Sequence, residues 1–127
     1  MLVLDAAAVR RLAERTPRTV ALLDALLDAG LWPAVVPAVV VAECLTGDEA
    51  TDAGTEALLA CCDIRTDVDL AVARRAAWLR TAAGRGSAAD AIVVASAEPR
   101  GAVLTAGRRV DVEALALFAD RVYVERC

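Results

Sequence analysis

Residues 87–105 read SAADAIVVASAEPRGAVLT, and this stretch indicates a helix that leads directly into a buried strand. Ser87 is a favourable N-cap, because its hydroxyl can accept a hydrogen bond from the free N–H groups of the first turn. Pro99 ends the helix, since proline cannot donate the backbone hydrogen bond that a longer helix would need. The following Gly101–Thr105 segment is almost entirely apolar, as is typical of a strand covered on both faces of a parallel sheet. A helix followed by such a strand predicts an α/β fold.

The same alternation of strands and helices extends over the whole chain. Short segments rich in apolar residues predict further strands at residues 1–5, 34–36, 63–66 and 121–125. Apolar stripes and capping residues predict further helices at residues 6–15, 17–29, 37–45, 50–62, 70–83 and 111–118. This order predicts a three-layer α/β sandwich, in which helices flank a central, mainly parallel sheet of about five short strands. The chain has 127 residues and no linker or repeat, so we expect one domain spanning residues 1–127.

The composition excludes several classes of chemistry. All 14 basic residues are arginine, and the chain contains neither lysine nor histidine. A Walker A loop, a lysine Schiff base and a Ser–His–Asp triad are therefore impossible. The net charge of −4 argues against a protein that coats nucleic acid broadly. No apolar run is long enough to cross a membrane, and the first residues lack the pattern of a signal peptide, so we expect a cytoplasmic protein without membrane contact.

The four cysteines give no sign of a zinc site. Cys61 and Cys62 are adjacent, and the chain has no CxxC pair. We expect Cys44, Cys61 and Cys62 to behave as small buried hydrophobic residues, and Cys127 to be an exposed thiol.

Three acidic residues stand alone within apolar segments: Asp5 in MLVLDAAAV, Glu43 in PAVVVAECL and Asp90 in SAADAIVVASA. An unpaired buried carboxylate is strongly destabilising, so three of them suggest one shared counterion. Asp5 follows the first strand, and sites in open parallel sheets lie at the carboxyl ends of strands. We therefore expect all three side chains to meet at one edge of the sheet. Carboxylate oxygens suit Mg²⁺ or Mn²⁺, and such an ion would allow phosphodiester hydrolysis without histidine or lysine.

The acidic residues also have structural interpretations. Asp5 could cap the helix that follows it, and Asp90 could stabilise the positive end of its own helix. Glu43 is harder to explain in this way, because its neighbours Val39 and Val40 place it beside the apolar face of its helix. From spacing alone, the metal site and the structural interpretation are about equally supported.

Three segments resemble the PIN-domain family, and within it the VapC toxins of bacterial toxin–antitoxin pairs. They are LVLDAAAV at residues 2–9, VPAVVVAECLTG at 36–47 and AADAIVVASAEPRGAVLTAG at 88–107, and they follow one another in the family's order. The resemblance implies a PIN-like sandwich and a Mg²⁺- or Mn²⁺-dependent endoribonuclease that cuts RNA. It also implies a homodimer and a VapB-like antitoxin that neutralises the enzyme.

By position, the resemblance assigns catalytic and metal-binding roles to Asp5, Glu43 and Asp90. Asp5 and Asp90 would bind the ion directly, while Glu43 would complete the site and orient the attacking water. The chain departs from the family at the fourth acidic position, where Gly107 stands in the turn after the late strand. Asp111 could serve as a replacement ligand, or it could cap the last helix. The missing acid leaves a second hypothesis open, in which the protein is a catalytically weak or inactive PIN-fold module that binds RNA or antitoxin.

Three arginines are predicted to lie near the acidic residues. Arg108 and Arg109 follow the late strand, and Arg85 lies in the loop before Asp90. An arginine can hold a phosphate through two hydrogen bonds, so these residues are candidates for RNA binding. Each could instead be a solvated loop charge. Because aromatic residues make up only 3% of the chain, we expect RNA recognition to depend on shape and backbone contacts.

Overall fold

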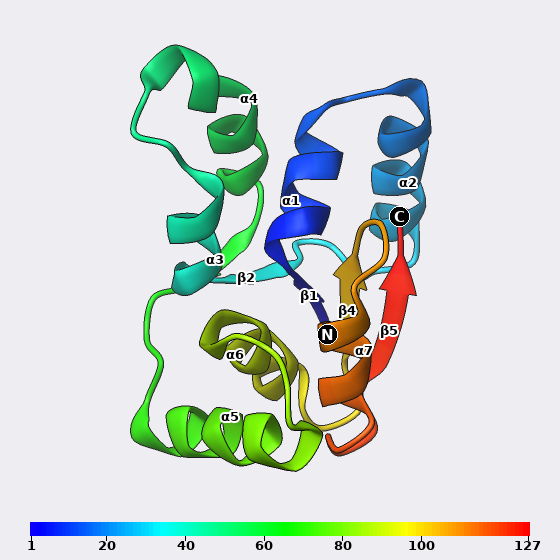
Figure 1. Cartoon of the computed structure of the whole chain (residues 1–127). Helices are drawn as coiled ribbons and strands as arrows, with labels where there is room; N and C mark the ends of the chain where they lie inside the picture. The colour runs from blue at the N-terminus through cyan, green and yellow to red at the C-terminus, as the bar shows by residue number, and fades with distance from the viewer.

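A five-stranded parallel sheet lies at the centre of the computed structural model, which describes the whole chain, residues 1–127 (Figure 1). In chain order the strands are β1 (Leu2–Leu4), β2 (Val35–Pro37), β3 (Asp63–Arg65), β4 (Ala102–Thr105) and β5 (Tyr123–Arg126). They are arranged across the sheet in the order β3-β2-β1-β4-β5, and every neighbouring pair is parallel. Parallel strands need a crossover connection, which is why helices separate all of them along the chain.

Helices cover both faces of the sheet (Figure 1). On one side lie α1 (Ala6–Ala13), α2 (Pro17–Asp28), α3 (Ala38–Cys44) and α4 (Glu49–Leu59), and on the other lie α5 (Leu70–Ala83), α6 (Ala88–Ala97) and α7 (Val110–Ala116). The chain builds the sheet from β1 outward to β3, then returns past β1 to β4 and β5. Because crossover connections are right-handed, this reversal moves the later helices to the opposite face. None of the helices combines the length and the apolar composition that a membrane span requires.

The predicted fold class is confirmed. The structure contains five strands and seven helices in the order that the sequence predicts, and they form an α/β sandwich consistent with a PIN-like architecture. One boundary has a consequence for the site: α7 begins at Val110, one residue earlier than expected. Arg109 therefore occupies the N-cap position, and Asp111 lies inside the first turn. The prediction that Asp111 caps this helix is wrong.

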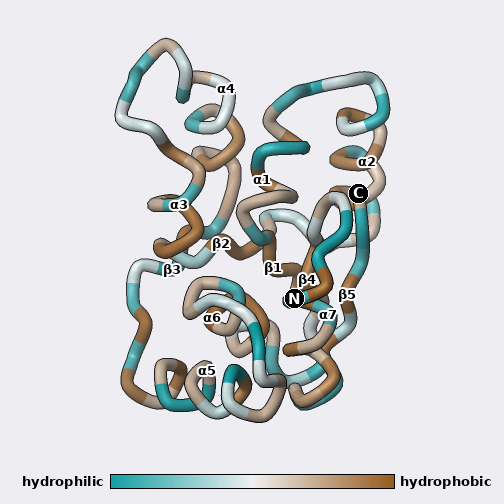
Figure 2. Tube along the Cα trace, viewed as in Figure 1, coloured by the Kyte–Doolittle hydropathy of each residue, from teal (hydrophilic) through white to brown (hydrophobic).

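The centre of the sheet is dry, whereas its edges face solvent. Val3 and Leu4 of β1 and Val103 of β4 are fully buried, while most residues of β3 and β5 are exposed. Figure 2 shows apolar segments gathered in β1, β4 and α6. Helices pack on the two faces through buried side chains such as Leu12 and Val93. Burial on both faces explains why the central strands show no alternation of polar and apolar residues.

The carboxyl ends of β1 and β4 form the topological switch point of the sheet. Leu4 pairs with Leu104, but the connections after these two strands run in opposite directions across the sheet. Open α/β sheets bind their ligands at such points. Asp5 follows β1 at this edge, and its backbone N–H donates to the Leu104 carbonyl at 3.2 Å. Thr105, the last residue of β4, is thereby brought next to Asp5.

Candidate functional site

Asp5 is held at the switch point by hydrogen bonds from two elements. Its side chain is only 1% exposed. Oδ1 accepts a hydrogen bond from the Ala8 N–H at 2.8 Å, which makes Asp5 the N-cap of α1 and confirms its predicted capping role. Oδ2 accepts a hydrogen bond from the Thr105 hydroxyl at 2.5 Å. The cap fixes one carboxylate oxygen, and the other is left to interact across the sheet edge.

Asp90 reaches the same place from the other helical layer. It lies in the first turn of α6, and Ser87 caps this helix by accepting a hydrogen bond from the Asp90 N–H at 3.0 Å. The Ser87 cap is confirmed. Gly86 allows the loop before α6 to lie close to Leu115. Its φ of +98° disfavours a side chain, and an added Cβ would come within 2.7 Å of Leu115. The loop therefore packs closely against α7, which lies next to α6.

Arg109 joins the two buried acids. Its Nη1 donates to Asp5 Oδ2 at 3.1 Å, and its Nη2 donates to Asp90 Oδ1 at 2.6 Å. We call this arrangement the Asp5–Arg109–Asp90 bridge. The two carboxylates lie in different helical layers, yet they lie within the span of one guanidinium. Of the three acids expected to meet at one edge of the sheet, Asp5 and Asp90 do so, and Arg109 acts as their shared counterion.

Glu43 does not join this cluster in the structure. Its side chain is exposed on α3, and the chain contains no group of three acidic, cysteine or histidine side chains that could hold a metal ion. The Glu43 carboxylate forms no hydrogen bond or ion pair, whereas its backbone carbonyl accepts a hydrogen bond from the Arg10 guanidinium at 2.7 Å. The next residue, Cys44, points inward and donates its thiol hydrogen to the Ala6 carbonyl. Because consecutive helical residues point about 100° apart, an inward Cys44 directs Glu43 toward solvent.

The charge and the donor atoms of the bridge indicate whether a metal ion would fit between Asp5 and Asp90. One positive group already binds both carboxylates, and the adjacent Thr105 hydroxyl adds a further oxygen. Mg²⁺ commonly binds through one or two carboxylates and completes its shell with water. The donor set is all oxygen and therefore fits Mg²⁺ or Mn²⁺ in the place of the guanidinium.

The other residues predicted for the site have different environments. Asp111 accepts a hydrogen bond from Arg85 Nε at 2.6 Å and is not part of the Asp5–Arg109–Asp90 bridge. The carboxylate of Asp111 holds Arg85 at the surface, whereas Arg108 is exposed and forms no ion pair. Gly107 has a φ of +67°, and nothing lies within 4 Å of an added Cβ. The turn therefore offers open space at the position where the resemblance to PIN domains led us to expect a fourth acid.

The cysteines follow the prediction only in part. Cys44 is buried, and burial raises the pKa of its thiol to about 11, as it does for the partly buried Cys62. Cys61 is exposed, so the prediction of burial is wrong there, because it lies in the turn after α4 and not on a packed face. Cys127 is not fully exposed, since it docks onto Thr105 beside β4. Burial also raises the pKa of the Cys127 thiol.

One buried acid escaped the sequence interpretation. Asp52 in α4 is 6% exposed and accepts hydrogen bonds from the Thr46 N–H and hydroxyl and from the Gly47 N–H. The backbone N–H of Thr46 is the main reason that the pKa of Asp52 lies below its usual value. The Thr-Gly turn five residues before an aspartate is the sequence signal for this contact. Asp52 thus fastens the turn between α3 and α4.

Comparisons with known proteins add no family to this geometry. No protein-family model matches the sequence, and no curated protein is significantly similar to it. The residues at the carboxyl ends of β1 and β4 are therefore the basis for assigning a function.

Proposed function

We propose that the protein is a Mg²⁺- or Mn²⁺-dependent endoribonuclease with Asp5 and Asp90 at its centre. The observation that carries this proposal is the Asp5–Arg109–Asp90 bridge at the switch point of the sheet. Two buried carboxylates that share one singly charged counterion keep an excess of negative charge, which favours a divalent cation. Their position at the carboxyl ends of the strands is the usual place for ligands in open α/β sheets.

The residues of the site would divide the work of phosphodiester hydrolysis. A bound ion would supply an activated water and offset the charge that develops on the phosphate and the leaving oxygen. Asp5 and Asp90 would hold the ion, and Thr105 and the Ala8 N–H keep Asp5 in a fixed orientation. A water oxygen would form a bond to phosphorus while the bond from phosphorus to one ribose oxygen breaks.

Glu43 and Arg109 would act at the rim of this site. Glu43 is exposed on α3 and would orient the attacking water and accept its proton. Arg109, released from the two carboxylates, would be free to bind the non-bridging phosphate oxygens. Arg108 has no ion pair and offers a second positive charge for the RNA backbone.

The same proposal includes two protein partners, a second copy of the chain and a VapB-like antitoxin. The surface of α2 supports a partner interface, because most of this helix is accessible and Thr19 is its only buried residue. Val20 and Leu27 are 43% and 58% exposed, and Leu22, Leu23 and Leu26 are half-buried. Apolar helical surface of this kind commonly marks a protein interface.

A second function, a binding module without catalysis, is favoured by two observations. Gly107 stands at the position where a fourth acid was expected, and Arg109 already forms ion pairs with both buried acids. In this case the protein would bind RNA or antitoxin with Arg109 permanently in place.

Cleavage by purified protein separates the two functions. We expect RNA cleavage with repeated turnover in excess Mn²⁺, and its loss when a chelator is added. Asp90→Asn, purified in the same way, should cleave at least about 100-fold more slowly, because the ion would lose one of its two carboxylates. An absence of turnover in excess Mn²⁺, or a loss below about tenfold in the variant, would exclude the nuclease and favour the binding module.

A further inference from the structure

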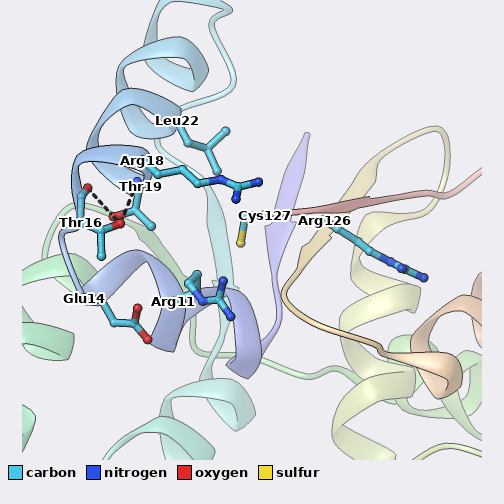
Figure 3. A pocket seen from close by; sticks show the side chains of 8 residues that line it. All are labelled: Arg11, Glu14, Thr16, Arg18, Thr19, Leu22, Arg126 and Cys127. Carbon is cyan, nitrogen blue, oxygen red and sulfur yellow. Dashed lines mark hydrogen bonds between the residues drawn. The ribbon is translucent and has the colours of Figure 1, made fainter.

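A cavity of about 230 Å³ opens beside the candidate site, between α1, the start of α2 and the end of β5 (Figure 3). It lies near the carboxyl end of β5 and is lined mostly by polar residues. The lining side chains are Arg11, Glu14, Thr16, Arg18, Thr19, Leu22, Arg126 and Cys127. We call this cavity the arginine pocket.

Two of the three arginines in the pocket have no acidic partner. Arg126 forms an ion pair with Glu113, and Figure 3 shows its side chain directed away from the other two. The side chains of Arg11 and Arg18 form neither an ion pair nor a hydrogen bond, although Glu14 lies in the same lining. Both line the cavity together with Cys127 (Figure 3). Two uncompensated guanidinium groups that converge on one cavity make it a site for an anion.

Both arginines exert an electrostatic effect on Cys127, which forms one end of the pocket. Burial raises the pKa of the Cys127 thiol, and Arg11 and Arg18 each act in the opposite direction. Thr16 caps α2 beside them, with its hydroxyl accepting a hydrogen bond from the Thr19 N–H. The N-terminus of this 12-residue helix adds a further positive potential on the same side.

The arginine pocket is connected to the candidate site through a single residue. The Cys127 N–H donates to the Thr105 carbonyl at 2.9 Å, and the Cys127 thiol contacts the same oxygen at 3.3 Å. The hydroxyl of Thr105 is bonded to Asp5. A ligand in the pocket and a ligand at the acidic pair would therefore be close neighbours along the carboxyl edge of the sheet.

We infer that the arginine pocket binds a backbone phosphate of an RNA substrate next to the phosphodiester at Asp5 and Asp90. This inference rests on the proposed nuclease function. Phosphate fits the pocket because its oxygens match the paired donors of a guanidinium, and because successive phosphates of one strand can occupy neighbouring sites. The volume accommodates a phosphate with part of its ribose. The scarcity of aromatic residues in the chain makes such backbone contacts the main available grip.

The test measures binding of a short fluorescent single-stranded RNA by anisotropy, with a chelator present so that no cleavage occurs. We compare Arg11→Gln and Arg18→Gln with Arg74→Gln, which removes the same charge from an exposed position on α5 that forms no ion pair. Each pocket variant should bind RNA about tenfold more weakly, as expected for the loss of a charged hydrogen bond. The slope of log affinity against log salt should fall by about 0.7 for each lost phosphate contact. Arg74→Gln should stay within about twofold of the unmodified protein.

The outcomes distinguish this inference from the proposed function. If the protein binds RNA through Arg11 and Arg18 but never cleaves it, the pocket stands and the nuclease fails. If it cleaves RNA while both pocket variants bind like Arg74→Gln, the inference is overturned and the nuclease stands. A labelled glutamate-rich peptide provides the last arm: peptide binding that requires Arg18, with RNA binding unchanged, would assign the pocket to an acidic protein partner and overturn the inference. A lack of RNA binding at low salt would overturn it as well.

Discussion

Two places in the molecule bury aspartate, and they stabilise its negative charge in different ways. Asp52 is held by the N–H groups of Thr46 and Gly47, which are fixed parts of the turn between α3 and α4. Asp5 and Asp90 share the side chain of Arg109, which is 27% exposed and comes from the segment that leads into α7. A backbone N–H cannot be removed without unfolding the turn, whereas a side chain can be exchanged for another cation. The first arrangement is structural, and the second suits a site that binds a ligand.

The largest expected effect is a difference in RNA cleavage rate between variants of Asp5 and of Asp52. Asp5→Asn should lower RNA cleavage in Mn²⁺ by at least about 100-fold, because the ion loses a direct ligand. Asp52→Asn should leave the cleavage rate per folded molecule unchanged, since Asp52 contacts none of the residues of the bridge. Initial rates below the melting temperature of both variants provide the measurement. Equal losses in the two variants would remove the distinction between a ligand site and a structural acid.

The second prediction concerns the exchange of Arg109 for a metal ion. In the presence of a chelator, Arg109→Gln should lose about 2 kcal/mol of stability, because two buried carboxylates lose their counterion. This corresponds to a fall in Tm of about 5 °C or more. Added Mn²⁺ should then raise the Tm of this variant more than that of the unmodified protein, whose own arginine competes with the ion.

Differential scanning fluorimetry with and without Mn²⁺ measures this exchange directly and requires no cleavage. Arg108→Gln is the matched control, because it removes a neighbouring arginine that forms no ion pair. An identical response to Mn²⁺ in all three proteins would mean that Arg109 and the ion do not compete for the two acids.

A smaller effect is expected at the open position after β4. Gly107→Asp should raise cleavage several-fold, or lower the Mn²⁺ concentration needed for half-maximal rate, by returning an acid to the turn. The substitution is feasible because nothing lies within 4 Å of an added Cβ, and aspartate tolerates the left-handed conformation better than most residues. Gly107→Ala is the control, since it carries the same backbone strain without the acid. Activity of the aspartate variant at or below the alanine level would argue that this position has no metal-binding role.

The smallest expected effect concerns Asp52 and the dependence of the melting temperature on pH. The folded-state pKa of Asp52 lies below its unfolded value, mainly because of the Thr46 N–H, so its carboxylate form stabilises the native protein. That contribution is complete above the unfolded pKa of about 4 and is lost as the pH falls through the lower folded value. Asp52→Asn should therefore have a lower Tm at neutral pH and a weaker loss of Tm on acidification. Parallel curves of Tm against pH for both proteins would show that the hydrogen bonds of Asp52 do not depend on its charge.

The order of elements was accessible from the sequence because local signals agree with the final fold. Ser87, Asp69 and Thr16 cap helices α6, α5 and α2, and the central strands carry no charged residues that would place them at an edge. These signals act over three or four residues and do not depend on distant parts of the chain. Asp5 and Asp90 could also be placed at one edge from the sequence, because Asp5 follows a strand and the helix that leads into the next parallel strand begins at the carboxyl edge of the sheet.

The electrostatic partners were not accessible in the same way. Which carboxylate Arg109 binds depends on the crossing of α6, α7 and β1, and the sequence gives no direct measure of that geometry. Glu43 was expected beside the apolar face of α3, but the inward direction of Cys44 turned it toward solvent. The arginine pocket escaped notice for a related reason: Arg11 and Arg18 lie on different helices, and Cys127 reaches them only through the pairing of β5 with β4.

The hydrogen bond between Thr105 and Asp5 joins residues near opposite ends of the chain. During synthesis, Asp5 leaves the ribosome about 100 residues before Thr105, and Arg109 follows four residues later. A growing polypeptide therefore carries an incomplete centre until β4 has inserted beside β1. If the protein cuts RNA, this order of assembly would keep the nascent chain harmless to the ribosome that is translating it.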